Sequence, residues 1–135
     1  MCGRFVIDVD PNFAQSIYSL TSVRVLQPRY NIAPSQKVPA VRETDTGEHE
    51  LTQLRWGLVP HWAKDLKIGY KMINARSETA SKKPSFRQAL KHRRCVIPAS
   101  GFYEWEKRSK EKIPHYIHMQ DGGVMSFAGL WAGRW

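Results

Sequence analysis

The cysteine at position 2 is the residue whose type and place in the chain point most directly to chemistry. If Met1 is removed, Cys2 carries an α-amine and a thiol on adjacent carbons. Ordinary pKa values of about 8 for an α-amine and about 8.5 for a thiol leave both groups partly reactive at neutral pH. Such a pair traps aldehydes, because the amine condenses to an imine and the thiol then closes a ring on the imine carbon. The alternatives are that Met1 is retained or that Cys2 is an incidental thiol on a mobile terminus.

Cys2 is followed by Gly3 and Arg4 in the motif MCGRF. Gly3 allows other backbone to approach Cys2 closely, because it has no Cβ. We expect the Arg4 guanidinium to lower the pKa of the thiol or to hold a phosphate.

The stretch INARSET, residues 73–79, places an amide, a cation and a carboxylate at alternate positions, Asn74, Arg76 and Glu78. In an extended segment all three side chains point to one face. That combination suits a polar site. The alternatives are a solvated strand face or an ion pair between Arg76 and Glu78.

The stretch PASGFYEWEK, residues 98–107, contains a carboxylate within an aromatic strand. Alternation predicts that Tyr103 and Trp105 share one face and that Glu104 lies on the other. A partly desolvated carboxylate is suited to general acid–base catalysis. The alternative is an exposed glutamate on an amphipathic strand.

The remaining candidates for chemistry carry less information. His115 and His118 are three residues apart and so fall on opposite faces of a strand, and Cys95 is followed by Val96 and Ile97, as a core residue would be. The two cysteines form no CxxC motif and the chain has no HExxH motif, so we expect no metal site. It has neither a GxGxxG motif nor a Walker loop, and we therefore expect no nucleotide cofactor.

Composition sets the class of protein and of partner. The chain has 135 residues, 41% hydrophobic and 24% charged, which is enough for one globular domain. A net charge of +9 favours a polyanion, with nucleic acid first and an acidic membrane surface second. Two cysteines are too few for a secreted disulfide scaffold, and no apolar run is long enough to span a membrane. We expect a reducing, cytoplasmic location.

The elements that must position these residues are mostly strands. Asp10 and Pro11 begin a predicted helix over residues 11–20, and Ser85 caps a second over residues 86–92. Residues 26–36 and most of 60–85 read as loop, because prolines and glycines interrupt them. Strands are predicted over residues 2–8, 37–43, 49–59, 95–107, 114–120 and 124–132. The prediction is an antiparallel α+β fold in which strands dominate.

Six stretches occur in an order that resembles a known family: MCGRF, RYNIAPSQ, LRWGLVPHWAKD, INARSET, KPSFRQALKHRRCVIPASGFYEWEK and FAGLW. They are similar to the SRAP, or SOS-response-associated peptidase, family, whose members crosslink to abasic sites in single-stranded DNA. The resemblance covers nearly the whole chain. It implies one domain over residues 1–135, a β-rich, barrel-like core with flanking short helices, and a basic groove for DNA.

The resemblance also implies roles for individual residues. It implies a catalytic set of Cys2, Asn74 and Glu104: Cys2 forms a thiazolidine with the ring-opened abasic sugar, Asn74 orients its amine, and Glu104 shuttles protons. It implies that Arg4 and Arg76 hold phosphates beside the lesion and that Trp62 and Pro34 pack against bases or wedge the strand at the lesion. Ser35 and Arg87 are weaker candidates for contacts to the phosphates. Glu78 has no assigned role. The place of action would be the nucleoid of a bacterium or the nucleus of a eukaryote.

One departure separates this chain from the family pattern. Members carry a further catalytic histidine in an H-x-R-x-P-like stretch, which none of His49, His61, His92, His115 and His118 matches. With an apolar strand running to the last residue, this predicts an N-terminal portion that is incomplete at its C-terminus. Two alternatives to a crosslinking protein stay open: a thiol autopeptidase that acts on its own N-terminus, and a protein that binds single-stranded DNA without a covalent bond.

Overall fold

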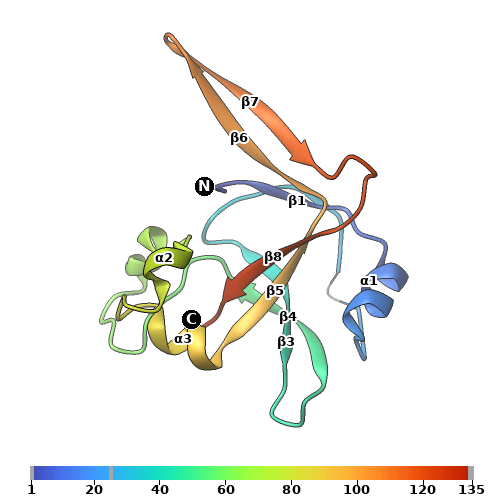
Figure 1. The fold of residues 1–135 in the computed structure, drawn as a ribbon, viewed down its shortest axis with the longest axis vertical. Helices are drawn as coiled ribbons and strands as arrows, with labels where there is room; N and C mark the ends of the chain where they lie inside the picture. The colour runs from blue at the N-terminus through green and yellow to red at the C-terminus, as the bar shows by residue number, and fades with distance from the viewer. Residues whose placement is uncertain (1, 25, 134–135) are drawn as a thin grey trace.

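The chain folds into two antiparallel four-stranded sheets with short helices at their sides (Figure 1). This computed structural model describes residues 2–24 and 26–133. The first sheet has the strand order β2-β1-β6-β7, formed by Arg29–Ile32, Phe5–Ile7, Gly101–Arg108 and Glu111–His118. The second has the order β4-β3-β5-β8, formed by His49–Arg55, Lys37–Glu43, Arg94–Ala99 and Met125–Leu130. The predicted α+β class is confirmed, but within the described residues the sheets are not closed into a barrel.

The single strand predicted over residues 95–107 is instead two strands in different sheets, and Ser100 is the break between them. The Ser100 amide donates to the Val6 carbonyl at 2.8 Å, and the Ser100 hydroxyl accepts from the Asp8 amide at 2.7 Å. These bonds to the β1 segment turn the chain out of β5 and into β6. Gly101 is required here, because a Cβ at this position would lie 2.6 Å from the Ile117 carbonyl oxygen.

Two further strand predictions differ from the structure. β4 ends at Arg55 and does not continue to Val59, because the backbone turns at Gly57, which has φ of +123° and approaches the Gly69 carbonyl oxygen so closely that a Cβ would lie 2.5 Å from it. Residues 26–36, predicted as loop, contain β2, which pairs with β1 despite the neighbouring prolines.

The first helix forms as its capping residues predict. α1 spans Pro11–Tyr18, and the Asp10 carboxylate accepts from the Phe13 amide at 2.8 Å. It ends before the predicted Leu20, because Ser19 adopts the left-handed conformation with φ of 53°.

The other helices differ from the predictions. α3 spans Arg87–His92, but Phe86 occupies its N-cap position and no side chain caps it, so the predicted Ser85 cap is wrong. The expected loop over residues 60–85 contains the 3-10 helix η1, Leu66–Lys71, and the short helix α2, Ser77–Ala80.

The main core lies where the two sheets face each other. Phe5, Ile7 and Ile32 of the first sheet are buried there with Val38 and Ala99 of the second. A second cluster of buried residues lies beside α2 and α3 and consists of Leu58, Ala80, Phe86 and Ala89. The N-terminal strand is therefore held in the centre of the molecule, which fixes the start of the chain.

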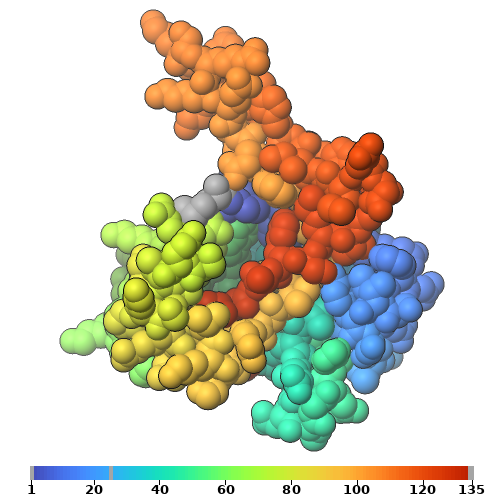
Figure 2. All heavy atoms as spheres, in the orientation of Figure 1, coloured from blue at the N-terminus to red at the C-terminus, as the bar shows by residue number. Residues whose placement is uncertain are grey.

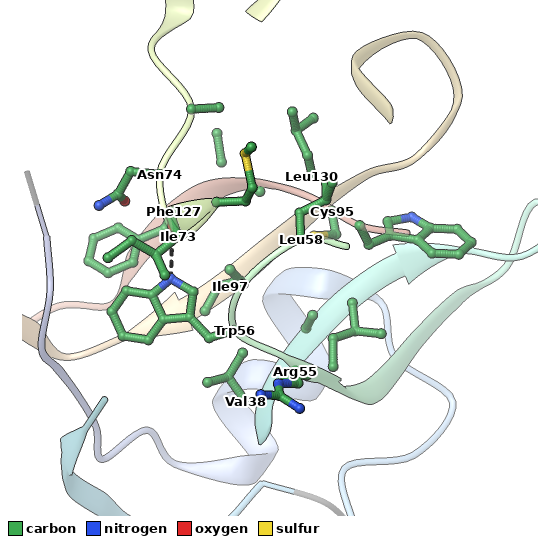
Figure 3. Close-up of a pocket in the computed structure, with 18 of the residues that line it drawn as sticks. Val38, Arg55, Trp56, Leu58, Ile73, Asn74, Cys95, Ile97, Phe127 and Leu130 are labelled. Atoms are coloured by element: carbon green, nitrogen blue, oxygen red, sulfur yellow. Dashed lines mark hydrogen bonds between the residues drawn. The ribbon is translucent and has the colours of Figure 1, made fainter. Parts of the chain in front are cut away.

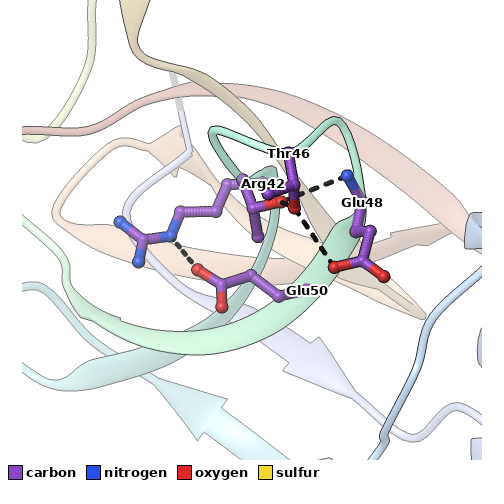
Figure 4. A network of polar contacts seen from close by, with 5 residues as sticks. Arg42, Thr46, Glu48 and Glu50 are labelled. Carbon is purple, nitrogen blue, oxygen red and sulfur yellow. Dashed lines mark hydrogen bonds and ion pairs between the residues drawn. The ribbon is translucent and has the colours of Figure 1, made fainter.

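Two hairpins extend from this core. The β3–β4 hairpin is closed by polar contacts, in which the Arg42 guanidinium binds Glu50 and the Thr46 hydroxyl donates to Glu48 at 3.2 Å (Figure 4). The β6–β7 hairpin projects away from the rest of the molecule as a two-stranded ribbon (Figures 1 and 2). Across the described residues, no helix is long and apolar enough to cross a membrane.

Candidate functional site

Cys2 lies directly before β1 and is anchored through its own backbone. Its side chain is half-buried against the main core, and its thiol donates to the Arg4 carbonyl oxygen at 3.5 Å. Its carbonyl oxygen accepts a hydrogen bond from the Asn74 side-chain amide at 2.8 Å. The structure thus joins two predicted site residues, although the Asn74 contact is to the Cys2 carbonyl and not to its amine.

The surroundings of the Cys2 thiol favour its neutral form. Burial raises the pKa of the Cys2 thiol above its ordinary value, and the negative charge of Glu104 raises it further. The expectation that the Arg4 guanidinium lowers this pKa is wrong, because that group extends to β2 and donates to the Asn31 side chain at 3.0 Å. The Glu104 carboxylate is therefore within electrostatic range of the thiol.

The segment that carries Asn74 is fixed by a tryptophan at the end of β4. The Trp56 indole donates to the Ile73 carbonyl oxygen at 2.8 Å, as Figure 3 shows. The Trp56 ring also packs edge-on against Phe5, with the ring centroids 5.3 Å apart. Trp56 therefore links β1, which follows Cys2, to the segment that holds Asn74.

The predicted extended conformation of residues 73–79 applies only to the first part of this stretch. Residues 74–76 are irregular, and Arg76 has extended dihedrals with an exposed side chain. α2 then begins at Ser77, because the Arg76 carbonyl accepts from the amides of Thr79 and Ala80. Glu78 is therefore helical, and its predicted alternation with Asn74 and Arg76 is wrong.

Glu104 is positioned by the alternation of β6. Tyr103 and Trp105 share a face as predicted, with their ring centroids 6.3 Å apart. Glu104 points to the opposite face, where it lies directly across from His115 of β7. His115 itself bonds to the neighbouring Glu106 at 2.9 Å. The pKa of Glu106 is lowered by its hydrogen bond to Arg108 and then by that to His115.

The other predicted DNA contacts lie on connections around these residues. Pro34 and Ser35 are in the β2–β3 connection, where Ser35 has φ of 73° and its amide donates to the Trp56 carbonyl at 2.8 Å. Trp62 lies between β4 and η1 with half of its surface exposed, and Arg87 is the exposed first residue of α3. The structure links Cys2 to Asn74 by a hydrogen bond and to Glu104 by an electrostatic interaction, whereas the Arg4 side chain contacts Asn31 of β2.

Two residues that position the site are absent from the sequence predictions. Asn31 orients Arg4, and Trp56 orients the Asn74 segment. The pair Trp56-Gly57 carried a usable signal, because a glycine within a predicted strand often marks a close backbone approach. Asn31 lies in residues 26–36, which were predicted as loop. Without a predicted strand there, no pairing with the strand that contains Arg4 was expected.

A pocket of about 450 Å³ opens beside Cys2 and Asn74, and its walls are mainly apolar (Figure 3). Cys95, Ile97 and Phe127 of the second sheet line it. Both cysteines are free thiols. No group of three His, Cys, Asp or Glu side chains among residues 2–24 and 26–133 is arranged to hold a metal ion.

Solved structures define the class of fold. A crystal structure of a protein from Bacteroides thetaiotaomicron is similar to this chain, with a TM-score of 0.81 and 26% sequence identity. The similarity covers 96% of this chain and 61% of that one. A phage-related protein from Bordetella bronchiseptica is also similar, with a TM-score of 0.76 and 29% identity.

Sequence comparison then gives the family. Residues 1–135 match the SOS response associated peptidase (SRAP) family, and the chain belongs to it. It is 46% identical over 143 residues to the abasic site processing protein YoaM of Bacillus subtilis, and 38% identical over 103 residues to the abasic site processing protein HMCES of Xenopus tropicalis. The chain spans 59% of the length of YoaM and 31% of the length of HMCES.

Proposed function

We propose that this protein processes abasic sites in DNA by forming a covalent bond to them through Cys2. The observation that carries the proposal is the hydrogen bond at Cys2, where Asn74 anchors its carbonyl at 2.8 Å, and the charge of Glu104 also acts on its thiol. Relatives named abasic site processing proteins support it, as does a net charge of +9 that suits a polyanion. Removal of Met1, which lies outside the described residues, would free the amine.

The reaction follows from the groups that Cys2 would present. The ring-opened abasic sugar carries an aldehyde, and the Cys2 amine adds to its carbonyl carbon to give a carbinolamine. Loss of one water produces the imine, and the sulfur then adds to the imine carbon while the thiol proton passes to the nitrogen. The product is a thiazolidine, whose mass equals that of protein plus DNA less one water.

The raised pKa of the Cys2 thiol favours this order of steps. A buried, neutral thiol is a poor first nucleophile, so the amine attacks before the sulfur does. Glu104 is suited to take a proton from the amine during addition and to return it to the departing hydroxyl. Asn74 is a positioning residue, because it holds the backbone of Cys2 and leaves the amine free to react.

The DNA contacts of this proposal are residues that are exposed, as Trp62, Arg76 and Arg87 are, or partly exposed, as Arg4, Pro34 and Ser35 are. Arg4 and Arg76 would bind phosphates beside the lesion, and Trp62 and Pro34 would pack on neighbouring bases. Ser35 and Arg87 would contact the phosphates further along. Unpaired DNA is the favoured substrate, since stacking on these side chains needs accessible bases. Because its proposed substrate is cellular DNA, the protein would act inside the cell.

The test is a crosslinking assay with an oligonucleotide that contains one abasic site. We expect an adduct that survives denaturation, with the mass of the protein without Met1 plus DNA less one water. Cys2→Ser should abolish it, whereas Cys95→Ala, which removes the other thiol, should not. An intact mass that lacks Met1, combined with no adduct from abasic DNA, would refute the proposal and leave noncovalent DNA binding as the function.

A second candidate function rests on the family description, which names a peptidase. In that case Cys2 would act as a thiol nucleophile on a peptide bond at the start of the chain, with Glu104 and Asn74 to activate it. The raised pKa of the thiol argues against it, because a peptidase needs the thiolate. Cleavage of a peptide without any DNA, lost in Cys2→Ser, would favour this candidate.

A further inference from the structure

The β6–β7 hairpin carries a surface that the site at Cys2 does not use. Strand register places Tyr103 opposite Tyr116, Trp105 opposite Pro114 and Lys107 opposite Lys112. Side chains at alternate positions share a face of the ribbon, so these six residues lie on the face opposite Glu104. We call this surface, together with His118 across from Gly101, the outer face of the hairpin.

Aromatic rings form a continuous row along the outer face. The ring centroids of Trp105 and Tyr103 are 6.3 Å apart, those of Tyr103 and Tyr116 are 5.3 Å apart, and those of Tyr116 and His118 are 5.2 Å apart. Trp105 and Tyr116 remain 43% and 44% exposed. Gly101 lets the Tyr116 ring lie against the sheet, because a Cβ there would be 2.6 Å from that ring. A row of exposed rings on a projecting ribbon is unusual unless it meets a partner.

Charge is divided between the two faces of the hairpin. Within residues 101–118, the carboxylates are Glu104, Glu106 and Glu111, and register places all three on the face opposite the rings. The outer face carries Lys107 and Lys112 directly opposite one another. Two like charges in this position repel, which costs stability unless an anion lies between them.

The outer face continues toward the Cys2 site through β1. Phe5 is buried in the core, so the preceding Arg4 leaves the sheet on the opposite face, which is that of Tyr103. The Tyr103 amide donates to the Arg4 carbonyl at 2.9 Å. Asp8 lies at the other end. The pKa of Tyr116 is raised by burial, then by Tyr103 and by the negative charge of Asp8. A bound polyanion would therefore run from the lysine pair along the rings toward Arg4 and stop before Asp8.

We propose that the outer face of the hairpin binds a run of unpaired nucleotides, whether or not they contain a lesion. Bases would stack on Tyr103, Trp105, Tyr116 and His118, and phosphates would lie against the lysine pair. Unpaired nucleic acid fits better than a protein surface, because the face combines exposed aromatic rings with two lysines that form no ion pair within residues 2–24 and 26–133. The proposal extends the proposed function by a second, noncovalent contact that needs no chemistry at Cys2.

The test measures binding of an undamaged, fluorescently labelled oligothymidine by anisotropy, beside a duplex of the same length. Loss of one stacked base is expected to weaken binding about tenfold, so Tyr116→Leu and Trp105→Leu should each show a loss of that size. Phe13→Leu replaces an equally exposed ring on α1 and should bind as the parent protein does. The duplex should bind more weakly than the single strand and should change little in the ring variants.

The lysine pair provides a second measurement that leaves every ring in place. In Lys107→Gln/Lys112→Gln, the slope of log affinity against log salt should become shallower by about 1.4, as expected for two phosphate contacts to a single strand. Arg24→Gln/Lys37→Gln removes the same charge outside the hairpin and should leave the slope nearly unchanged.

Two outcomes would overturn the inference. One is an affinity within twofold of the parent in both ring variants together with an unchanged salt slope in the lysine variant. The other is a change of sedimentation in Tyr116→Leu without loss of DNA affinity, which would make the outer face a contact between copies of the chain. A negative result in this binding test is separate from a negative result in the crosslinking test of the proposed function. Undamaged DNA has no aldehyde, so its binding does not depend on the chemistry of Cys2, which only the crosslinking test measures.

Discussion

The hydrogen bond from Asn74 to the Cys2 carbonyl provides the sharpest test of how Cys2, the proposed nucleophile, is held. It measures 2.8 Å, is partly buried, and joins residues that are 72 positions apart in the chain. A bond of this kind contributes about 0.5–1.5 kcal/mol net. If it holds Cys2 in the reactive position, its loss lowers the population of that position about two- to thirteenfold, since RT is about 0.6 kcal/mol.

The perturbations are Asn74→Ala, which removes the amide, and Asn74→Asp, which keeps the shape but has no N–H to donate. We expect the single-turnover rate of adduct formation on abasic DNA to fall by about two- to thirteenfold in Asn74→Ala. Asn74→Asp should fall further, because a carboxylate oxygen would face the Cys2 carbonyl oxygen. Asn12→Ala, on the exposed surface of α1, is the matched control.

The assay compares adduct formed over time on denaturing gels, with protein in excess over DNA. Affinity for undamaged DNA is measured beside it, because a positioning role lowers the rate and leaves that affinity unchanged. An adduct rate in Asn74→Ala within experimental error of the control would refute the reasoning. An equal loss of rate and of affinity would show that Asn74 supports the fold of the DNA-binding surface and not the position of Cys2.

Three further predictions concern stability and are measured by urea unfolding. Burial raises the pKa of the Cys95 thiol from 9.0 to about 11. Because the folded state then favours the protonated thiol, the free energy of unfolding falls as the pH rises from about 9 to about 11. Relative to Cys95→Ala, the fall should approach about 2–3 kcal/mol. Gly57→Ala should cost about 3 kcal/mol, because its Cβ would meet the Gly69 carbonyl at 2.5 Å with φ of +123°. Asp10→Ala should cost about 1 kcal/mol through loss of the cap on the Phe13 amide, and an unchanged midpoint would show the cap to be dispensable.

Local sequence patterns predicted the parts of the fold that depend on neighbouring residues. Asp10 and Pro11 gave the start of α1, and alternation placed Tyr103 and Trp105 on one face. The division of residues 95–107 between two sheets depends on bonds from Ser100 to the distant β1 segment. Pro98, Ser100 and Gly101 nevertheless indicate an interruption of the strand, which the prediction of one continuous strand did not include.

The candidate site was predictable in its residue types and not in its contacts. Cys2 was singled out by its position, but its link to Asn74 spans 72 residues and depends on the tertiary fold. The sequence suggested that Arg4 would lower the pKa of the Cys2 thiol, but burial of Cys2 against the core raises it. The Arg4 guanidinium, although close in sequence, binds Asn31 instead. Trp56, which connects both parts of the site, looked like an ordinary strand residue until its indole contact with Ile73 was known.

The pairing of β1 with β6 also determines when the site can form during synthesis. Phe5 pairs with Phe102, so the first strand has no partner on that side until the chain has grown by nearly 100 residues. At about 5–20 residues per second, the ribosome needs roughly 5–20 s to add them. During this interval the N-terminus is not yet enclosed by its partner strand, so Met1 would be accessible to the aminopeptidase that the proposed function requires. The late closure of the first strand thus gives the time in which the reactive amine of Cys2 would be exposed.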